Sequence, residues 1–328
     1  MRPHSSNAAH PTARPFTEED TMPNRLDIAK TYKLFVNGAF PRSESGRTTL
    51  VSTPKGEPIA HVAKASRKDL REAVEAARGA LAKWSEGTTA YNRAQILYRV
   101  AEMMEGKRGE FVEALARVGP DAAAGGARAK GVKKGATKGL RPEDEVSLAI
   151  DRVVHFAGWA DKHAQVLGCC NPVAGPFYTF TSPEPVGVVA VVSPRTPALL
   201  AMVSLMAPAL AAANTCVVLA SEQNPLLGAL LGEVLATSDV PPGVVNVLTC
   251  EHAELLPIIA GHRDIDGVHG AGLPAAHAAI LHGGAAENVK RVTIRTPAPD
   301  WASDAACEHP GWIEPLVEFK TIWHPASA

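Results

Sequence analysis

The chain has 328 residues, of which 46% are hydrophobic and 20% are charged, and its formal net charge at pH 7 is −1. This composition predicts a folded protein of about two domains, and the near-zero net charge argues against nucleic acid or a membrane surface as a partner. No apolar run approaches the ~18 residues of a membrane-spanning helix, and five cysteines are too few for a disulfide framework, so we expect a cytoplasmic protein.

The chain begins with a polar tail. Residues 1–30 have neither hydrophobic periodicity nor the apolar core of a secretory signal, so we expect a disordered tail there. Met22 is a candidate start of translation, because patterned sequence begins just after it. Tyr32–Gly38 then predicts a strand that ends in an Asn-Gly turn, and Ala39 begins the returning strand of a hairpin.

Three amphipathic helices follow this hairpin. Ser66–Asp69 matches a capping box, and apolar residues up to Trp84 then recur at helical spacing. A second helix over Leu97–Leu115 and a third over Ser147–Leu167 show the same spacing. We therefore expect residues 31–184 to form an N-terminal region of a hairpin, helices and bridging strands.

A segment rich in Gly, Ala and Lys interrupts the helices over residues 119–142. Its residues 127–141 carry six basic side chains and no acid, with no apolar face to bury, so a flexible, solvated insertion is expected. The alternative is a loop that binds anions or nucleic acid, although it lacks the aromatic side chains on which single strands stack.

From Pro185 on, short apolar runs alternate with segments of helical length. The apolar runs are Val186–Val192, Cys216–Leu219, Val244–Leu248 and Ile265–Val268. This alternation predicts an α/β fold with a Rossmann-like, doubly wound parallel sheet over residues 185–287. Ligands bind such a sheet beyond the carboxyl ends of its strands. The candidate crevice segments are therefore Ser193–Thr196, Ala220–Glu222, Thr249–Glu251 and His269–Gly272.

The last part of the chain predicts two half-exposed strands. Val289–Arg295 and Leu316–Trp323 both alternate apolar and polar residues. We expect residues 288–328 to supply an antiparallel oligomerisation strand element, which pairs with another sheet edge, including that of another subunit.

Five motifs in sequence order carry a resemblance to a known family. They are Leu34–Gly38, Pro185–Val189, Ala207–Thr215, Ser221–Leu226 and Pro241–Val247. Together they resemble the aldehyde dehydrogenase superfamily over Tyr32–Gly270. The ending, with Asn288–Val292, Asp300-Trp301 and Val317–Pro325, resembles a branch in which a half without the nucleophile accompanies a second such half. The resemblance implies that the catalytic domain is largely absent here.

The resemblance also implies a site for NAD or NADP, with departures from the family pattern. Pro194-Arg195-Thr196 stands where the family has Pro-Trp-Asn, and Ala220-Ser221-Glu222 stands where it has Lys-Pro-Ser-Glu. Glu222 could accept from ribose hydroxyls or serve a helix N-terminus, and Gly270 lies in a phosphate-binding or a plain turn. The predicted cofactor-binding residues are Ser193, Pro194, Thr196, Ser221, Glu222 and Gly270.

No catalytic or metal-binding residue is predicted. The family oxidises aldehydes with a cysteine nucleophile and a glutamate base. Leu281–Gly284 only echoes the Gly-Gly part of the base segment, and the acids around Cys307 should raise the pKa of its thiol. Cys216 is expected in the core, Cys250 ends a strand, and the histidines show no metal-ligand spacing.

These observations favour a non-catalytic structural or regulatory subunit. It would assemble with a full-length aldehyde dehydrogenase, or with itself, through its C-terminal strand, with NAD as a possible cofactor. The alternative is an NAD(P)-dependent oxidoreductase that acts on aldehydes with a degenerate site, and a decayed product without a partner is a third reading. We predict that Val317→Asp and Ile322→Asp disrupt assembly, because charge on a buried strand face is costly.

Overall fold

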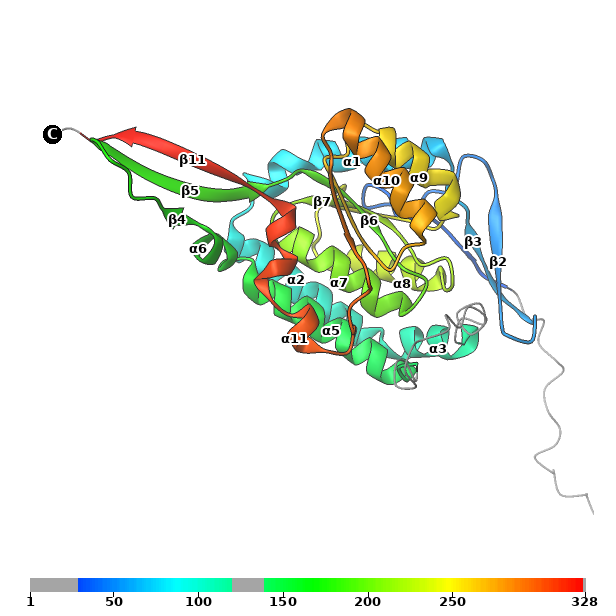
Figure 1. Cartoon of the computed structure of the whole chain (residues 1–328). Helices are drawn as coiled ribbons and strands as arrows, with labels where there is room; N and C mark the ends of the chain where they lie inside the picture. The colour runs from blue at the N-terminus through cyan, green and yellow to red at the C-terminus, as the bar shows by residue number, and fades with distance from the viewer. Residues whose placement is uncertain (1–28, 120–138, 327–328) are drawn as a thin grey trace, which may run out of the picture.

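The computed structural model describes residues 29–119 and 139–326 (Figure 1). The predicted tail up to residue 28, Met22 and most of the basic insertion lie outside the described residues. No helix in the described part of the chain is long and apolar enough to cross a membrane.

Five parallel strands form the central sheet. Their bounds are Val188–Val192 (β6), Thr215–Leu219 (β7), Val245–Leu248 (β8), Gly267–Ala271 (β9) and Arg291–Arg295 (β10). The strand order is β10-β9-β6-β7-β8, so the chain first winds outward from β6 to β8 and then returns to the other side of β6. The predicted doubly wound sheet is confirmed, and its topological switch point lies between β6 and β9.

Helices cover both faces of this sheet (Figure 1). One face carries α7 (Ala198–Ala211) and α8 (Leu226–Leu235). An outer layer covers those two with α2 (Ala90–Gly106), α3 (Arg108–Val118) and α5 (Pro142–Trp159). The other face carries α1 (Arg67–Ser85), α9 (His252–Gly261) and α10 (Ala275–Asn288). Strand residues are apolar on both faces because each face packs against helices.

The N-terminal region differs in detail from the prediction. The capping box at Ser66 forms, but the second predicted helix is two helices that meet at Lys107. The third helix likewise ends at Trp159, and a short α6 (His163–Leu167) follows. A small sheet of β1 (Thr31–Tyr32), β2 (Thr48–Ser52) and β3 (Pro58–Ala63) was not predicted.

The predicted hairpin is a tight turn and not a pair of long strands. Asn37 and Gly38 have positive φ angles of 52° and 72°, as an Asn-Gly turn requires. Val36 bridges to Ala39 across this turn. Phe35 instead bridges to Val247, so the turn attaches to the outer edge of β8.

A three-stranded antiparallel sheet projects from the body of the molecule (Figure 1). It consists of β5 (Phe177–Pro185), β11 (Val317–Pro325) and the short β4 (Cys169–Cys170), in the order β11-β5-β4. We call this sheet the arm. The predicted antiparallel element is therefore present, and it joins β11 to two strands that lie far before it in the sequence.

The predicted boundary at residue 287 is wrong for one strand. Arg291–Arg295 is β10, which pairs in parallel with β9 and completes the central sheet. Its Val292 and Ile294 pack against the core on the face that α9 and α10 cover. This packing explains the alternation of apolar and polar residues, from which a half-exposed strand was predicted. After β10, residues 296–316 run to β11 through the short helices α11 (Asp304–Cys307), η1 (Pro310–Trp312) and η2 (Glu314–Leu316). We call residues 296–316 the connecting segment.

Candidate cofactor crevice

The candidate crevice lies at the carboxyl ends of β6, β7 and β9. Ser193 follows β6 directly and is fully buried, and its hydroxyl has no hydrogen-bond partner in the described part of the chain. Pro194 is buried beside it, whereas Thr196 is exposed just before α7. Ser193 thus has an unpaired hydroxyl but no exposed surface, whereas Thr196 is open to solvent.

Ser221 ties the first two strand ends together. Its hydroxyl donates to the carbonyl oxygen of Arg195 at 2.7 Å and accepts from the N–H of Gln223 at 3.2 Å. The Arg195 guanidinium in turn donates to the side chain of Gln223 at 2.9 Å. The structure therefore uses Ser221 to join the loops after β6 and β7.

Glu222 caps the N-terminus of a helix, which is one of the two roles predicted for it. Its carboxylate accepts a hydrogen bond of 2.8 Å from the backbone N–H of His252, the first residue of α9. The Arg195 guanidinium lies 3.9 Å from the other carboxylate oxygen. The helix is α9 and not the α8 that follows Glu222 in sequence, because the two strand ends lie side by side.

His252 is a buried neighbour that the sequence analysis did not single out. Burial lowers the pKa of this imidazole, and its Nε2 lies 3.0 Å from the carbonyl oxygen of Ala220. A carbonyl oxygen only accepts, so Nε2 carries the proton and donates it. His252 therefore fixes the end of β7 against the start of α9.

Gly270 is not in a turn. It lies inside β9, which continues to Ala271, and a Cβ atom at Gly270 would lie 3.2 Å from the Leu273 side chain. The turn is at Gly272, which has a φ angle of 59°. The turn that we expected at Gly270, phosphate-binding or plain, therefore lies two residues later, at Gly272.

Three chain segments meet at the switch point. A Cβ atom at Gly272 would lie 3.2 Å from the Cβ of Ala298 and 3.8 Å from the Cβ of Pro194. The Gly272 N–H also donates to the carbonyl oxygen of Arg295 at 3.1 Å. The loops after β6, β9 and β10 therefore close on one another at the centre of the crevice.

The start of α10 leaves polar groups without partners. Its N-cap, Pro274, supplies no side-chain hydrogen bond, and within the described residues none is made to the N–H groups of its first turn. The buried Nδ1 atom of His277, in the same turn, is also unpaired among the described residues.

One thiol, that of Cys250, lies close enough to the crevice to interact with the carboxylate of Glu222. Cys216 is buried in β7, and burial raises the pKa of its thiol. Burial, together with the carboxylates of Glu222 and Glu254, raises the pKa of Cys250. Burial also raises the pKa of Cys307, although Arg152 opposes that shift. Cys169 and Cys170 are exposed, but they belong to the arm.

The comparisons with known proteins agree with this arrangement. The profile of the aldehyde dehydrogenase family matches residues 40–300. The chain belongs to the aldehyde dehydrogenase family. The match extends beyond the predicted limit at Gly270 and includes β10. The segment Leu281–Gly284, which resembles the Gly-Gly part of the family's base segment, lies inside α10.

Aldehyde dehydrogenases from distant organisms are similar over about four-fifths of this chain. Retinal dehydrogenase 2 of Mus musculus is 34% identical over 274 residues, which are 82% of this chain and 49% of that protein. Aldehyde dehydrogenase family 2 member B4, mitochondrial, of Arabidopsis thaliana is 32% identical over 279 residues, which are 84% and 48%. The chain thus spans about half the length of these curated relatives.

Solved structures show the same relationship. The NAD+ complex of aldehyde dehydrogenase from Bacillus cereus is 28% identical, with a TM-score of 0.70, and the similarity covers 80% of this chain and 50% of that one. The complex of PnpE with nicotinamide adenine dinucleotide is 27% identical with a TM-score of 0.69.

The family implies a dinucleotide, and the crevice residues fit part of one. The unpaired N–H groups at the start of α10 and the unpaired His277 Nδ1 suit a phosphate group. Ser221 and Glu222 are already hydrogen-bonded within the protein, so less of their capacity remains for a ribose. A dinucleotide would therefore be held chiefly through its phosphates.

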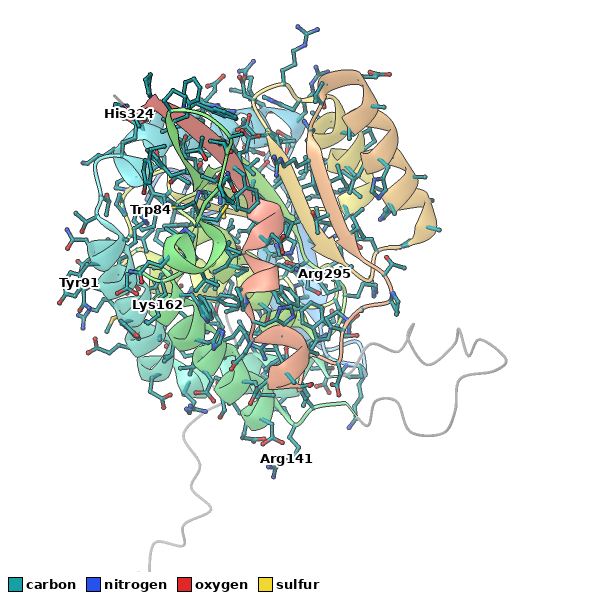
Figure 2. All side chains as sticks on the ribbon, turned by 60° about the vertical axis from the view of Figure 1, so that its left-hand side comes forward. Trp84, Tyr91, Arg141, Lys162, Arg295 and His324 are labelled. Carbon is teal, nitrogen blue, oxygen red and sulfur yellow. The ribbon has the colours of Figure 1, made fainter. Side chains whose placement is uncertain are left out.

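The connecting segment is anchored by a group that the sequence analysis missed. Arg152 on α5 is fully buried, lies 3.3 Å from the carboxylate of Glu308 and donates to the carbonyl oxygen of Trp301 at 3.3 Å. Trp312 stacks under the Arg295 guanidinium, whose central carbon is 3.7 Å from the ring centroid. Figure 2 shows Arg295 beside this segment. Arg152 and Glu308 lie too far apart in the sequence for any residue spacing to predict this contact.

Proposed function

We propose that this chain is a non-catalytic member of the aldehyde dehydrogenase family that acts as a structural or regulatory subunit. The observation that carries the proposal is the course of the chain after β10. Residues 296–316 pack on α5 through Arg152 and lead directly into β11, which completes the arm. The chain thus keeps the cofactor-type sheet and the arm, with no thiol at the crevice suited to attack an aldehyde.

The partner that we propose is a full-length aldehyde dehydrogenase. The arm exposes large apolar side chains, with Trp323 57% and Ile322 47% exposed. A projecting sheet with exposed aromatic residues and a free edge is a place where another chain adds a strand. Two exposed thiols at Cys169 and Cys170 support a reducing, cytoplasmic setting.

Co-expression with a full-length aldehyde dehydrogenase from the same genome tests this function. We expect the two chains to co-purify, and Ile322→Asp to abolish co-purification while the chain stays folded. Glu287→Asp, on the distant α10, is a matched surface control. Val317 is fully buried at the base of the arm, so Val317→Asp tests folding rather than assembly. Failure to co-purify, with the chain folded, contradicts the proposal.

A second candidate function is an NAD(P)-dependent oxidoreductase. The unpaired groups at the start of α10 favour it, as does similarity to structures solved with NAD+. Titration of the purified chain with NADH, followed by nucleotide fluorescence, tests binding. Saturable binding with turnover of an aldehyde supports the enzyme, and binding without turnover supports a subunit that only holds the nucleotide.

A further inference from the structure

A cavity of about 470 Å³ lies where the arm joins the body of the molecule. It is bordered by residues 183–185 at the end of β5 and by residues 212–213 after α7. These residues lead into β6 and β7, so the cavity lies at the amino ends of the strands, whereas the cofactor crevice lies at their carboxyl ends. The volume is that of a small-molecule site, for which ~300–1,000 Å³ is usual.

Arg93 on α2 contributes a guanidinium group to the wall of this cavity. The residue is only 7% exposed, and its Nη1 donates to the carbonyl oxygen of Thr88 at 2.5 Å. Its buried Nε has no hydrogen-bond partner among the described residues. Burial lowers the pKa of Arg93, and no carboxylate opposes that shift. The cavity wall therefore holds a buried cation that lacks a counter-ion in the described part of the chain.

A ligand with a carboxylate group would supply the counter-ion that Arg93 lacks. A buried charge is costly unless an opposite charge pairs with it. A guanidinium binds a carboxylate through two parallel hydrogen bonds, and the unpaired Nε is one of the donors that such a pair uses. The environment of Arg93 therefore favours a carboxylate ligand.

His163 restricts the negative charge of that ligand. It lines the same cavity, and its Nδ1 lies 3.2 Å from the carbonyl oxygen of Trp159. Because a carbonyl oxygen only accepts, Nδ1 carries the proton and Nε2 is left as an acceptor. Burial lowers the pKa of His163, and the charge on Arg93 lowers it further, so the imidazole is neutral at pH 7. One cation beside a neutral acceptor suits a carboxylate better than a doubly charged phosphate.

Three helices end at this cavity. The carboxyl-terminal ends of α1, α5 and α7 reach it at Ser85, Ala160 and Ala212. The last carbonyl groups of a helix carry partial negative charge and attract cations. The cavity therefore has a place for a positive group in addition to the carboxylate.

The carboxylates of the lining add to this negative charge. Glu184 pairs with Lys320, and the Asp161 carboxylate lies 3.3 Å from the Lys162 ammonium group. Glu86, the C-cap residue of α1, forms no ion pair with any described residue. Its carboxylate is therefore the one best able to accept a positive group of a ligand.

We propose that this cavity binds a zwitterionic amino carboxylate, namely a free α-amino acid with an apolar side chain. The carboxylate of the ligand pairs with Arg93, and its ammonium group lies near Glu86 and the helix ends. Alanine and proline form most of the remaining lining, so the side chain of the ligand meets an apolar wall. The site is separate from the cofactor crevice and does not depend on the proposed function.

Calorimetric titration of the purified chain with three matched compounds tests the proposal. L-phenylalanine carries both charges, 3-phenylpropanoate lacks the ammonium group, and 2-phenylethylamine lacks the carboxylate. We expect saturable binding of L-phenylalanine and about tenfold weaker binding of each analogue, because each loses one charged contact. Failure of L-phenylalanine to bind at millimolar concentration, or equal affinity for either analogue, overturns the proposal.

Two variants test the assignment of the two charges. Arg93→Met should weaken the binding of L-phenylalanine by about a hundredfold, because the carboxylate loses its charged donors. Glu86→Gln, at an exposed position, should weaken L-phenylalanine by about tenfold and leave 3-phenylpropanoate unchanged.

Glu72→Gln, at an exposed position of the same helix, is the matched control and should change neither affinity. Because Glu86 and Glu72 are both exposed, this comparison decides the matter even if Arg93→Met does not fold. Equal affinities for L-phenylalanine in the Glu86 and Glu72 variants overturn the assignment of the ammonium group. All of these measurements use the chain alone, so a negative result leaves the proposed role as a subunit standing.

Discussion

The carboxylate of Glu145 on α5 accepts a hydrogen bond of 2.8 Å from the backbone N–H of Leu199, in the first turn of α7. The next N–H, that of Leu200, lies 3.3 Å from the same oxygen. α7 has no side-chain cap of its own, since its N-cap residue is Pro197. A residue from another helix thus caps α7 and fixes α5 against it.

Replacing Glu145 should therefore destabilise the whole domain. We expect Glu145→Ala to lower the free energy of unfolding by about 1–2 kcal/mol, because two N–H groups lose their acceptor. Glu145→Gln keeps a carbonyl acceptor and should lose less. Urea denaturation followed by far-UV circular dichroism measures both. If both variants lost the same unfolding free energy, the hydrogen bonds from Glu145 to α7 would not be what stabilises the protein at this position.

The pH dependence of stability at Glu145 has a definite sign. Burial raises the pKa of this carboxyl above its usual value of 4.5, so the folded state holds the proton more tightly than the unfolded state. The contribution of Glu145 to stability therefore falls as pH rises from about 4.5 through the raised pKa, and above that pKa it is constant. The difference in unfolding free energy between the wild type and Glu145→Gln should change over that window and nowhere above it.

Arg152 should be among the most sensitive positions. Its side chain is fully buried against Glu308 and the Trp301 carbonyl. Arg152→Met leaves both acceptors without a cation, and breaking a buried pair costs about 3–5 kcal/mol. Arg152→Met combined with Glu308→Gln should recover part of that loss in chemical denaturation. A double variant no more stable than the single one would contradict the pairing.

The strands of the central sheet were predictable from sequence because each is marked by a short run of consecutive apolar residues. Strands buried on both faces are apolar throughout, so Val188–Val192 and Thr215–Leu219 could be found as runs. β10 was misassigned because an edge strand such as Arg291–Arg295 has polar residues on its less covered face. Its parallel pairing with β9 depends on the intervening α10, which no short pattern shows.

The site was predictable only as a set of loops. The order of strands and helices located Ser193, Ser221 and Glu222 at the crevice, but not their partners. Glu222 meets His252 across thirty residues of sequence, and Arg152 on α5 meets Glu308 in the connecting segment. Such pairs depend on tertiary packing, because neither partner lies within one helical turn or one hairpin of the other.

His269 predicts loss of stability in acid. Burial lowers the pKa of this imidazole to about 3, and its Nδ1 lies 3.0 Å from the Leu205 carbonyl oxygen. The unfolded chain binds a proton near pH 6.5 and the folded chain does not, so stability falls as pH drops from about 6.5 toward 3. His269→Asn keeps a donor near the Nδ1 position and removes the charge. We expect its thermal midpoint to depend less on pH between 6.5 and 4 than that of the wild type.

Val289 should limit the stability of the domain through its backbone. It ends α10 with a φ angle of 58° and is 93% exposed, so a β-branched residue holds a left-handed conformation with no packing in return. That conformation costs an L-residue about 1–2 kcal/mol, and glycine adopts it without steric cost. We expect Val289→Gly to raise the free energy of unfolding by about 1 kcal/mol despite the greater freedom of the unfolded chain. Val289→Ala keeps the Cβ atom and should gain much less, so equal gains in the two variants would assign the effect to exposed apolar surface.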